Sequence, residues 1–265
     1  MNKLLVLAKN KETYFIKKLI KELGHQRVIL YNPWKDHGPS EFTNILVRTS
    51  GIYGDSKDLD FLHQAKVPIL NPLSSLEIFR SKSSQYKFFD LAHHPCALWC
   101  SIKEKDFLNW QTDLFLVKPD FGQGGWGIEV LSGAALNNWI KEKKIKGDLS
   151  WIIQPYLKAS EYRVFFIGDE RFFLKRMSSG KNVAANFAAD GEARLVKLPE
   201  HLTDMVEKLI KTSQAYYGAI DLLDHAKGPV FLELNVVPGI EQLEALTHHN
   251  IIQILVSAKF FCQQS

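Results

Sequence analysis

Cysteine, net charge and long apolar runs are all scarce in this sequence of 265 residues. The three cysteines (Cys96, Cys100 and Cys262) are too few and too odd in number for a disulfide framework, which favours a reducing, cytoplasmic environment. Near the N-terminus the apolar stretch is only Leu4–Ala8, shorter than the roughly 7–15 apolar residues of a secretory signal. No segment approaches the ~18 uncharged apolar residues of a membrane span, so we expect no membrane contact.

The charge balance excludes a further class of partner. Lys and Arg total 33 against 29 Asp and Glu, and this excess of +4 is small and scattered, so we expect no nucleic-acid binding. Hydrophobic residues make up 46% and charged residues 23%, which is typical of a folded globular chain and excludes disorder and fibrous repeats.

Hydrophobic periodicity predicts two kinds of organisation along the chain. Strand patterns over 4–8 and 28–31 flank an amphipathic helix that Gly24 can end, and this βαβ unit implies a parallel sheet. Strands near 45–47 and 67–70 complete a small α/β unit. After a helix at 81–92 the strand patterns dominate, at 114–117, 128–131, 151–154, 162–167, 171–175, 218–223 and 230–235. Helices are expected at 134–144, 199–216 and 251–261. We therefore expect an α/β N-terminal domain with a parallel sheet, followed by an α+β body rich in hairpins.

A glycine-rich segment follows a strand that ends in a lysine. Gly122, Gly124 and Gly127 form G-x-G-x-x-G, but Ile128–Leu131 alternates like a strand, whereas a dinucleotide fingerprint needs a helix there. The glycines therefore lie in a β-hairpin, where backbone N–H groups can approach phosphate oxygens. An ordinary glycine hairpin would look similar; Lys118 at the end of the preceding strand favours phosphate binding. Protein kinases place their lysine after the loop, so the order excludes them.

Two acidic residues interrupt apolar strands near the C-terminus. The segments 218–223 and 230–235 are joined by a polar turn near Lys227, and this hairpin brings Asp221 opposite Glu233, with Asn235 on the same face. Facing carboxylates repel each other, and a divalent cation between them removes that cost. Three oxygen donors suit Mg²⁺ better than zinc. A solvated acidic hairpin is the alternative, but it does not explain acids within hydrophobic runs.

Cationic and polar groups between these two motifs suit phosphoryl transfer. Arg163 and Arg176 follow apolar strand patterns into the same region, and Asn186 lies in a loop rich in glycine and alanine. Such groups neutralise phosphoryl oxygens and hold carboxylates.

In this order the motifs resemble the ATP-grasp superfamily and, within it, the RimK-like branch of amino-acid ligases. The resemblance covers essentially the whole chain and is strongest from Leu116 to Glu244. It implies an N-terminal α/β domain at 1–79, then two α+β subdomains with antiparallel sheets that hold ATP between them, at 80–155 and 156–265. It also implies an ATP-dependent ligase that joins a carboxylate to an amine through an acyl phosphate and releases ADP and phosphate.

The resemblance also implies roles for individual residues. Lys82 and Lys118 are similar to the two nucleotide lysines, Lys118 and Arg176 to the catalytic cations, and Gly124, Gly125 and Gly127 to the loop over the phosphates. Gln154, Pro155, Tyr156 and Leu157 match the hinge beside adenine, and Glu161 matches the acid on the ribose. Asp221, Glu233 and Asn235 match the ligands of two Mg²⁺ ions, for which Mn²⁺ can substitute. Arg48, Arg163 and Asn186 lie where the branch binds its substrates.

The identity of the acid and of the amine stays open, whether amino acid, peptide or protein terminus, and so does a homo-oligomeric state. After Asn186 the branch often has a basic loop, whereas this chain has Phe-Ala-Ala-Asp-Gly. D-alanine–D-alanine ligases have an arginine two residues before the first acidic metal ligand, whereas this chain has Ala219 there, which argues against that activity. Two alternative functions remain: another ATP-grasp activity (a carboxylate–thiol ligase or a kinase), and a non-catalytic nucleotide-binding module.

Overall fold

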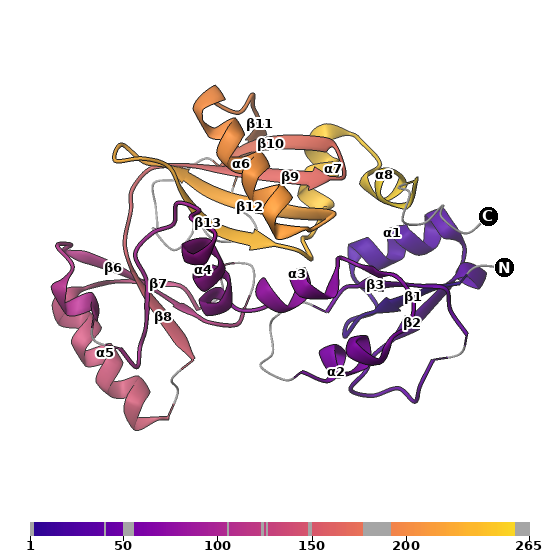
Figure 1. Cartoon of the computed structure of the whole chain (residues 1–265), viewed down its shortest axis with the longest axis horizontal. Coiled ribbons are helices and arrows are strands. Elements are labelled where there is room, and N and C mark those ends of the chain that lie inside the picture. The colour runs from indigo at the N-terminus through magenta and orange to yellow at the C-terminus, as the bar shows by residue number, and fades with distance from the viewer. Residues whose placement is uncertain are drawn as a thin grey trace.

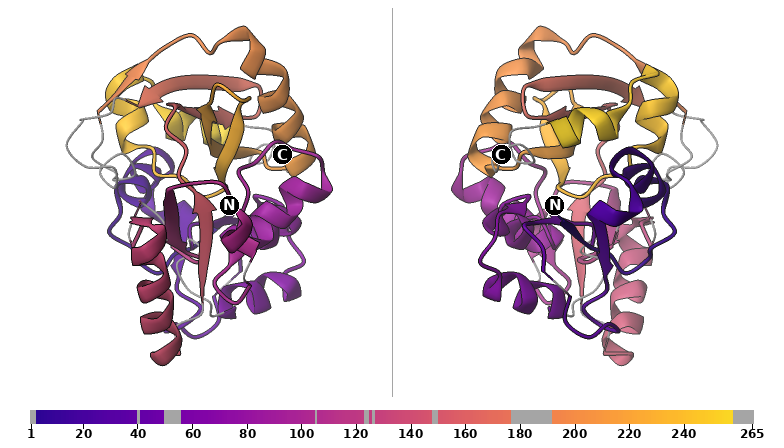
Figure 2. Two further views of the ribbon diagram at one scale, coloured as in Figure 1. Left: turned by 90° about the vertical axis from the view of Figure 1, so that its left-hand side faces the viewer. Right: turned by 90° about the vertical axis from the view of Figure 1, so that its right-hand side faces the viewer.

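Three β-sheets follow one another along the chain in the computed structural model of this protein (Figure 1). The structure describes residues 3–39, 41–49, 56–104, 106–122, 125, 127–147, 150–176 and 192–257. The last of the three sheets lies above the other two in Figure 1 and in the side views of Figure 2. The three predicted regions, 1–79, 80–155 and 156–265, each contain one sheet, and their division into domains stays a proposal.

The first sheet is parallel, with strand order β2-β1-β3-β4. Its strands are β1 (Leu4–Leu7), β2 (Val28–Tyr31), β3 (Asn44–Val47) and β4 (Ile69–Leu70), and its helices are α1 (Tyr14–Leu23), α2 (Lys57–Gln64) and α3 (Leu73–Ile78), with a 3₁₀ turn η1 (His25–Arg27). The side chain of Thr13 caps the start of α1, and Gly24, with a positive φ of 84°, ends it. The carboxyl ends of the parallel strands face the site described below.

The central sheet is antiparallel, with order β5-β8-β6-β7. It consists of β5 (Cys100–Ser101), β6 (Leu114–Pro119), β7 (Glu129–Ser132) and β8 (Trp151–Pro155). Helix α5 (Gly133–Ile145) covers it, and a 3₁₀ turn η2 (Asp106–Asn109) packs at its edge. Helix α4 (Lys82–Leu91) precedes this sheet in the chain but packs beneath β13 of the third sheet (Figure 1).

The third sheet is antiparallel and has the order β11-β10-β9-β12-β13. Its strands are β9 (Ser160–Ile167), β10 (Glu170–Arg176), β11 (Ala193–Leu195), β12 (Tyr217–Asp224) and β13 (Val230–Asn235). Helix α6 (Glu200–Ser213) buries Leu202, Val206 and Leu209 against one face of the sheet. Helices α7 (Glu241–Thr247) and α8 (Ile251–Ser257) follow, and α8 lies beside α1 (Figure 1).

Buried polar side chains join the first sheet to the third. Asn71, which is fully buried, donates to the carbonyl oxygens of Tyr217 and Val236 at 2.9 and 2.7 Å. Its Oδ1 accepts from the amides of Tyr216 and Tyr217 at 2.7 and 3.0 Å. The side chain of Asn71 therefore satisfies four backbone groups at the starts and ends of β12 and β13.

A second connection lies between α1 and the C-terminal helices. The carboxylate of Glu244 accepts from Tyr14 Oη at 2.6 Å, from Lys18 Nζ at 2.5 Å and from the amide of Ile251 at 2.7 Å. Glu244 is 6% exposed, so this is a shielded contact between distant parts of the chain.

The predicted fold class is confirmed, and the strands and helices expected from periodicity are present within a few residues. Sequence patterns did not reveal β5, β11, α2, α3 or α7, all of which are eight residues or shorter. Within the described part of the chain, none of the helices has the length and apolar character needed to span a bilayer.

Candidate nucleotide and metal site

A row of charged side chains crosses the third sheet. Arg163 on β9 is the register partner of Asp221 on β12, and Asp221 is the partner of Glu233 on β13. Directly paired residues of antiparallel strands point to the same face of the sheet, so a guanidinium and two carboxylates lie side by side. The predicted hairpin register is therefore present, with a bulge immediately after Asp221. Asn235 pairs with Ala219, two positions further along the same face.

Two arginines neutralise Asp221, which is 6% exposed. Arg163 donates through Nε and Nη2 to the two carboxylate oxygens at 2.6 and 2.5 Å. Arg176 Nη2 lies 3.8 Å from Asp221 Oδ2. Burial would raise the pKa of Asp221, but the guanidinium groups outweigh it and hold the pKa below its ordinary value. The carboxylate is therefore ionised at neutral pH.

Arg176 forms its closer ion pair with Glu161, whose Oε1 lies 2.8 Å from Arg176 Nη1. Glu161 is 8% exposed, and burial raises its pKa to about 7 although Arg176 opposes the shift. The two arginines thus connect Glu161 and Asp221 across strands β9, β10 and β12. Carboxyl groups whose pKa values are shifted in opposite directions within one cluster are typical of functional sites.

A buried lysine lies on the central sheet, opposite this cluster. Lys118, near the end of β6, is 5% exposed, and its Nζ donates to Tyr86 Oη at 2.7 Å. Burial lowers the pKa of Lys118 to about 7, and repulsion from Lys82 adds to the effect, while Glu233 and Asp221 oppose it. Among the described residues no carboxylate lies within ion-pair distance of this amine. A buried ammonium group without an anionic partner indicates a site for an anion.

Tyr86 joins the two halves of the site. Its hydroxyl donates to the carbonyl oxygen of Leu232 on β13 at 2.6 Å and lies 3.3 Å from Gln154 Oε1 on β8. The neighbouring Gln85 accepts from the amide of Leu234 through Oε1. Helix α4 therefore contacts the central sheet and the third sheet through side chains one residue apart.

The first turn of α4 lies against the end of β6. Asp120 accepts from the amide and the hydroxyl of Ser83 at 2.7 and 2.8 Å, and the Nζ of Lys82 donates to the carbonyl oxygen of Gly122 at 3.0 Å. Lys82 is 8% exposed. These contacts place Lys82 beside the end of β6, the strand that carries Lys118.

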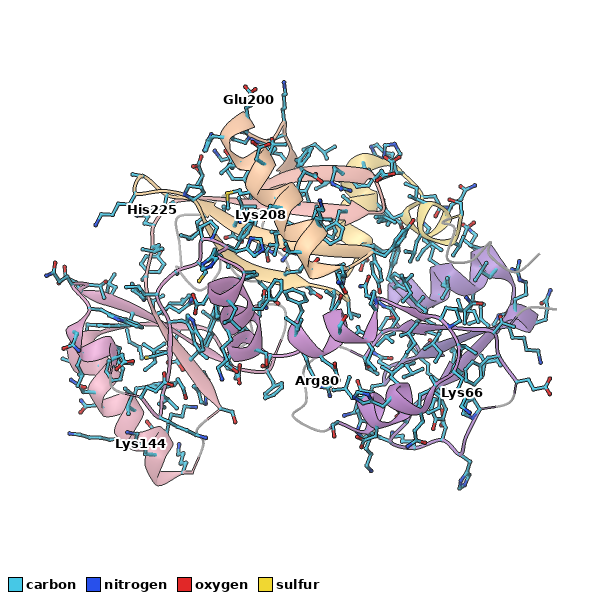
Figure 3. All side chains as sticks on the ribbon, viewed as in Figure 1. Lys66, Arg80, Lys144, Glu200, Lys208 and His225 are labelled. Carbon is cyan, nitrogen blue, oxygen red and sulfur yellow. The ribbon has the colours of Figure 1, made fainter. Side chains whose placement is uncertain are left out.

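One pocket brings these elements together. Its walls include Lys82, Gln85 and Gly122 on one side and Glu233 and Asn235 on the other. Arg80 and Asp58 also line this pocket, and they form a buried ion pair with 3.0 Å between Arg80 Nη1 and Asp58 Oδ1. Figure 3 labels Arg80 on the segment between α3 and α4, where the first sheet meets the rest of the molecule. Lys82, Glu233 and Asn235, three of the residues predicted from the sequence, therefore line one cavity.

The predicted hinge follows β8. Gln154 is 1% exposed, and its Nε2 has no hydrogen-bond partner among the described residues. The amide of Tyr156 donates to the carbonyl oxygen of Leu114 at 2.9 Å. A buried side-chain amide with an unpaired N–H group indicates a site for a polar acceptor.

The glycine-rich loop is described only in part. Gly122, Gly125 and Gly127 have positive φ values of 142°, 75° and 75°. A Cβ at Gly127 would lie 2.9 Å from Pro119 Cγ, so a larger residue does not fit this turn. The predicted loop residue Gly124 and the predicted substrate residue Asn186 lie outside the described residues.

Arg48, the remaining predicted substrate residue, lies in a second pocket rather than with Arg163 and Arg176. Its guanidinium stacks on Phe15, with 3.8 Å to the ring centroid, and donates to the carbonyl oxygen of Pro238 at 3.0 Å. This pocket has a volume of about 500 Å³ and lies at the carboxyl ends of β1 and β3. Thr49 and Val237 line both pockets, and Thr49 Oγ1 is buried with no partner among the described residues.

The donor set for a metal consists of two carboxylates and one amide. Among the described residues no cluster of three His, Cys, Asp or Glu side chains can hold a metal ion. Asp221, Glu233 and Asn235 fit a hard divalent cation through oxygen atoms, with Glu233 and Asn235 lining the nucleotide pocket. Asn235 Oδ1 also accepts from the amide of Val237 at 2.8 Å, which fixes the orientation of its side chain.

Sequence reasoning missed Tyr86 and Asp120. Tyr86 follows Lys82 by one helical turn, and Asp120 follows Lys118 by two residues, so both stand beside predicted residues. A tyrosine or an aspartate at such a spacing from a lysine does not by itself indicate a functional site, and only the fold shows that these two side chains contact the site.

A family model and curated relatives match the sequence of this chain. The sequence model of the RimK-like ATP-grasp domain matches residues 117–258, more than half of the chain. Uncharacterized protein MG011 of Mycoplasma genitalium is 24% identical over 277 residues, covering 96% of this chain and 91% of that protein. Probable alpha-L-glutamate ligase 1 of Shewanella denitrificans is 32% identical over 110 residues, covering 40% of this chain and only 37% of that relative.

Solved structures share the fold at low sequence identity. A RimK-domain ATP-grasp protein of Sphaerobacter thermophilus has a TM-score of 0.73 at 15% identity and covers 98% of this chain and 99% of its own. D-alanine–D-alanine ligase of Bacillus anthracis has a TM-score of 0.70 at 16% identity, with 99% and 96% covered. A RiPP-associated ATP-grasp ligase of Chryseobacterium gregarium, solved with ADP and a leader and core peptide, also has a TM-score of 0.70 at 16% identity, with 100% and 98% covered.

Proposed function

The chain belongs to the RimK-like ATP-grasp family, and from this premise we propose that it is an ATP-dependent ligase that joins a carboxylate to an amine. The observation that carries the proposal is the buried Lys118, which feels the charge of Glu233, Asp221 and Glu161 but has no carboxylate within ion-pair distance among the described residues. A nucleotide supplies the phosphate groups that such an amine binds, and its divalent cation suits the oxygen donors of Asp221, Glu233 and Asn235.

In this proposal ATP lies between the central sheet and the third sheet. Lys82 and Lys118 bind its phosphates, and Gly124, Gly125 and Gly127 contribute backbone N–H groups above them. The segment 154–157 contacts the adenine, and the unsatisfied Nε2 of Gln154 supports a polar ligand there. Glu161 accepts hydrogen bonds from the ribose hydroxyls.

Asp221, Glu233 and Asn235 are the proposed ligands of Mg²⁺ or Mn²⁺, with two ions expected. The cations would neutralise charge on the β- and γ-phosphate oxygens. Arg176, which contacts Glu161 and Asp221, is the proposed stabiliser of the transferred phosphoryl group.

The proposed reaction has two steps. An oxygen of the substrate carboxylate, already a nucleophile at neutral pH, attacks the γ-phosphorus, and the bond to ADP breaks. The amine then attacks the acyl carbon of the acyl phosphate, loses a proton and displaces inorganic phosphate, which leaves an amide. Water has to be kept from the acyl phosphate, which is consistent with a site between two sheets.

We propose the pocket of about 500 Å³ beside Arg48 as the binding site of a substrate, either an amino acid or the end of a peptide. Arg48 and the hydroxyl of Thr49, which has no partner among the described residues, favour a carboxylate there. Because Thr49 and Val237 also line the nucleotide pocket, a bound substrate can reach the site of phosphoryl transfer. Arg163 and Asn186 are the further proposed substrate residues.

The unpaired cysteines Cys96 and Cys100 support a cytoplasmic location.

The direct test incubates the protein with ATP, Mg²⁺ and a panel of amino acids and dipeptides, and measures phosphate release together with product mass. Hydroxylamine replaces the amine in a parallel reaction, since it traps an acyl phosphate as a hydroxamate. We expect Asp221→Asn to lower turnover more than about 100-fold. The matched control is Asp224→Asn, three residues further along β12, where the carboxylate contacts His201.

Other outcomes identify the alternative functions. Phosphate release that requires a thiol indicates a carboxylate–thiol ligase, and a phosphorylated product without an amide indicates a kinase. Nucleotide binding with no turnover across the whole panel would contradict the proposal and leave a non-catalytic binding module.

A further inference from the structure

Arg163 binds the carboxylate of Asp221, the side chain that we propose as a metal ligand. Its Nε and Nη2 bind both carboxylate oxygens, at 2.6 and 2.5 Å. This two-point contact is the strongest geometry in which an arginine binds a carboxylate. Arg163 and Asp221 are register partners on adjacent strands, so the backbone positions the two groups for each other before any ligand binds.

The ion pair compensates the buried negative charge of Asp221. Asp221 is 6% exposed, and a buried ionised carboxylate without a cation is costly. Arg176 lies farther away, at 3.8 Å, and its closer partner is Glu161. Arg163 therefore supplies most of the counter-charge that a divalent cation would otherwise provide.

A divalent cation on the same carboxylate would be repelled by this guanidinium. Two positive groups that share one carboxylate lie within a few ångströms of each other, where repulsion in a partly buried site is strong. The metal and Arg163 therefore compete for Asp221.

We propose that Arg163 is a built-in counter-cation that holds Asp221 in the metal-free protein and is displaced when the divalent cation binds with the nucleotide. This inference rests on the proposed function, because it takes Asp221 as a metal ligand. The exchange frees the guanidinium for an anionic substrate, which is the role that the sequence predicts for Arg163.

The test measures metal affinity rather than turnover. Mn²⁺ is titrated into the full-length protein saturated with ADP, and the free ion is counted by electron paramagnetic resonance. Because a competitor that must first leave lowers apparent affinity, we expect Arg163→Gln to bind Mn²⁺ at least about tenfold more tightly than the wild type. Arg163→Lys keeps the charge but loses the two-point contact, and it should give an intermediate gain.

Arg176→Gln is the matched control, because it removes a positive charge near the same carboxylate without removing a hydrogen bond to it. Equal gains in Arg163→Gln and Arg176→Gln would indicate a general charge effect and would overturn the exchange. Weaker Mn²⁺ binding in Arg163→Gln would also overturn it, since Arg163 would then position Asp221 for the metal.

Thermal unfolding in EDTA gives an independent measurement. The wild type should lose little stability on metal removal, whereas Arg163→Gln should melt about 5–10 °C lower in EDTA and recover with Mn²⁺ and ADP. If Arg163→Gln does not fold, Arg163→Lys decides by the same two measurements. A wild type that binds neither ADP nor Mn²⁺ contradicts the proposed function itself, whereas a wild type that binds both, with no gain in either Arg163 variant, contradicts only the exchange.

Discussion

We predict that Lys118 makes the proposed nucleotide binding depend on pH in a range where most lysines do not titrate. Burial and the neighbouring Lys82 lower the pKa of its ammonium group to about 7, whereas an exposed lysine titrates near ~10.4. Only the protonated form attracts phosphate. If bound phosphates restore an ordinary pKa, the affinity for ADP is greatest below pH 7 and falls as the pH rises above it.

The size of the effect follows from the two pKa values. Above pH 7 each pH unit removes up to about 1.4 kcal/mol of binding free energy, a factor of ten. Between pH 7.5 and 9.5 the dissociation constant of ADP should therefore rise by roughly 50- to 100-fold. Phosphate esters complete their ionisation near pH ~6, so the nucleotide itself contributes little in this range.

Isothermal titration calorimetry of MgADP at several pH values measures this dependence. Repeating each titration in buffers of different ionisation enthalpy also counts the protons taken up on binding, which should approach about one at pH 8. Lys118→Arg, which stays charged, and Lys118→Met, which is never charged, should both lose the pH dependence. Lys82→Met should weaken binding and move the pH dependence to higher pH, because it removes the repulsion that helps to lower the pKa of Lys118. A wild-type affinity that is constant from pH 7.5 to 9.5 would refute the reasoning.

Two further predictions concern the contacts that join the first and third sheets. Asn71→Leu leaves four buried backbone groups without their hydrogen-bond partner, at about 1–3 kcal/mol each, and should lower the melting temperature by more than about 6 °C. The control Asn109→Leu, at an exposed position of the η2 turn, should change the melting temperature little. Equal shifts in the two variants would show that the Asn71 hydrogen bonds are unimportant. Contacts with Lys18 and Tyr14 hold the pKa of Glu244 below its ordinary value despite its burial, so Glu244 stabilises the fold above about pH 4.3, and this contribution disappears as the pH falls through the lowered pKa. The difference in melting temperature between wild type and Glu244→Gln should therefore shrink on acidification from pH 7 to 3, and a constant difference would contradict this account.

The sequence predicted the features that depend on local periodicity. The alternation of residues 218–223 and 230–235 about a turn near Lys227 determines which side chains face each other, so the pairing of Asp221 with Glu233 followed without a structure. The bulge after Asp221 did not follow, because a one-residue irregularity leaves no mark on an apolar strand pattern. The short helices α2 and α3 escaped for the same reason, since eight and six residues carry too little periodicity.

Contacts between segments that are far apart in the chain could not be predicted from local sequence patterns. Arg163 and Asp221 are 58 residues apart, and they meet only because β9 inserts between β10 and β12. The sequence indicated both residues but assigned them to different partners, substrate and metal. Tyr86 carried no signal at all, because a tyrosine on a helix ordinarily indicates core packing, and only the tertiary fold brings its hydroxyl to Lys118.

The hydroxyl of Tyr86 has a consequence for evolution and engineering. One oxygen atom connects helix α4 to a backbone carbonyl of β13 and also holds the amine of Lys118. Heat resistance and the proposed nucleotide binding by Lys118 thus depend on a single atom, so we expect that selection cannot adjust one at this position without altering the other. Thermostable variants of this enzyme should accumulate their changes elsewhere, and libraries that randomise residue 86 should return the native tyrosine.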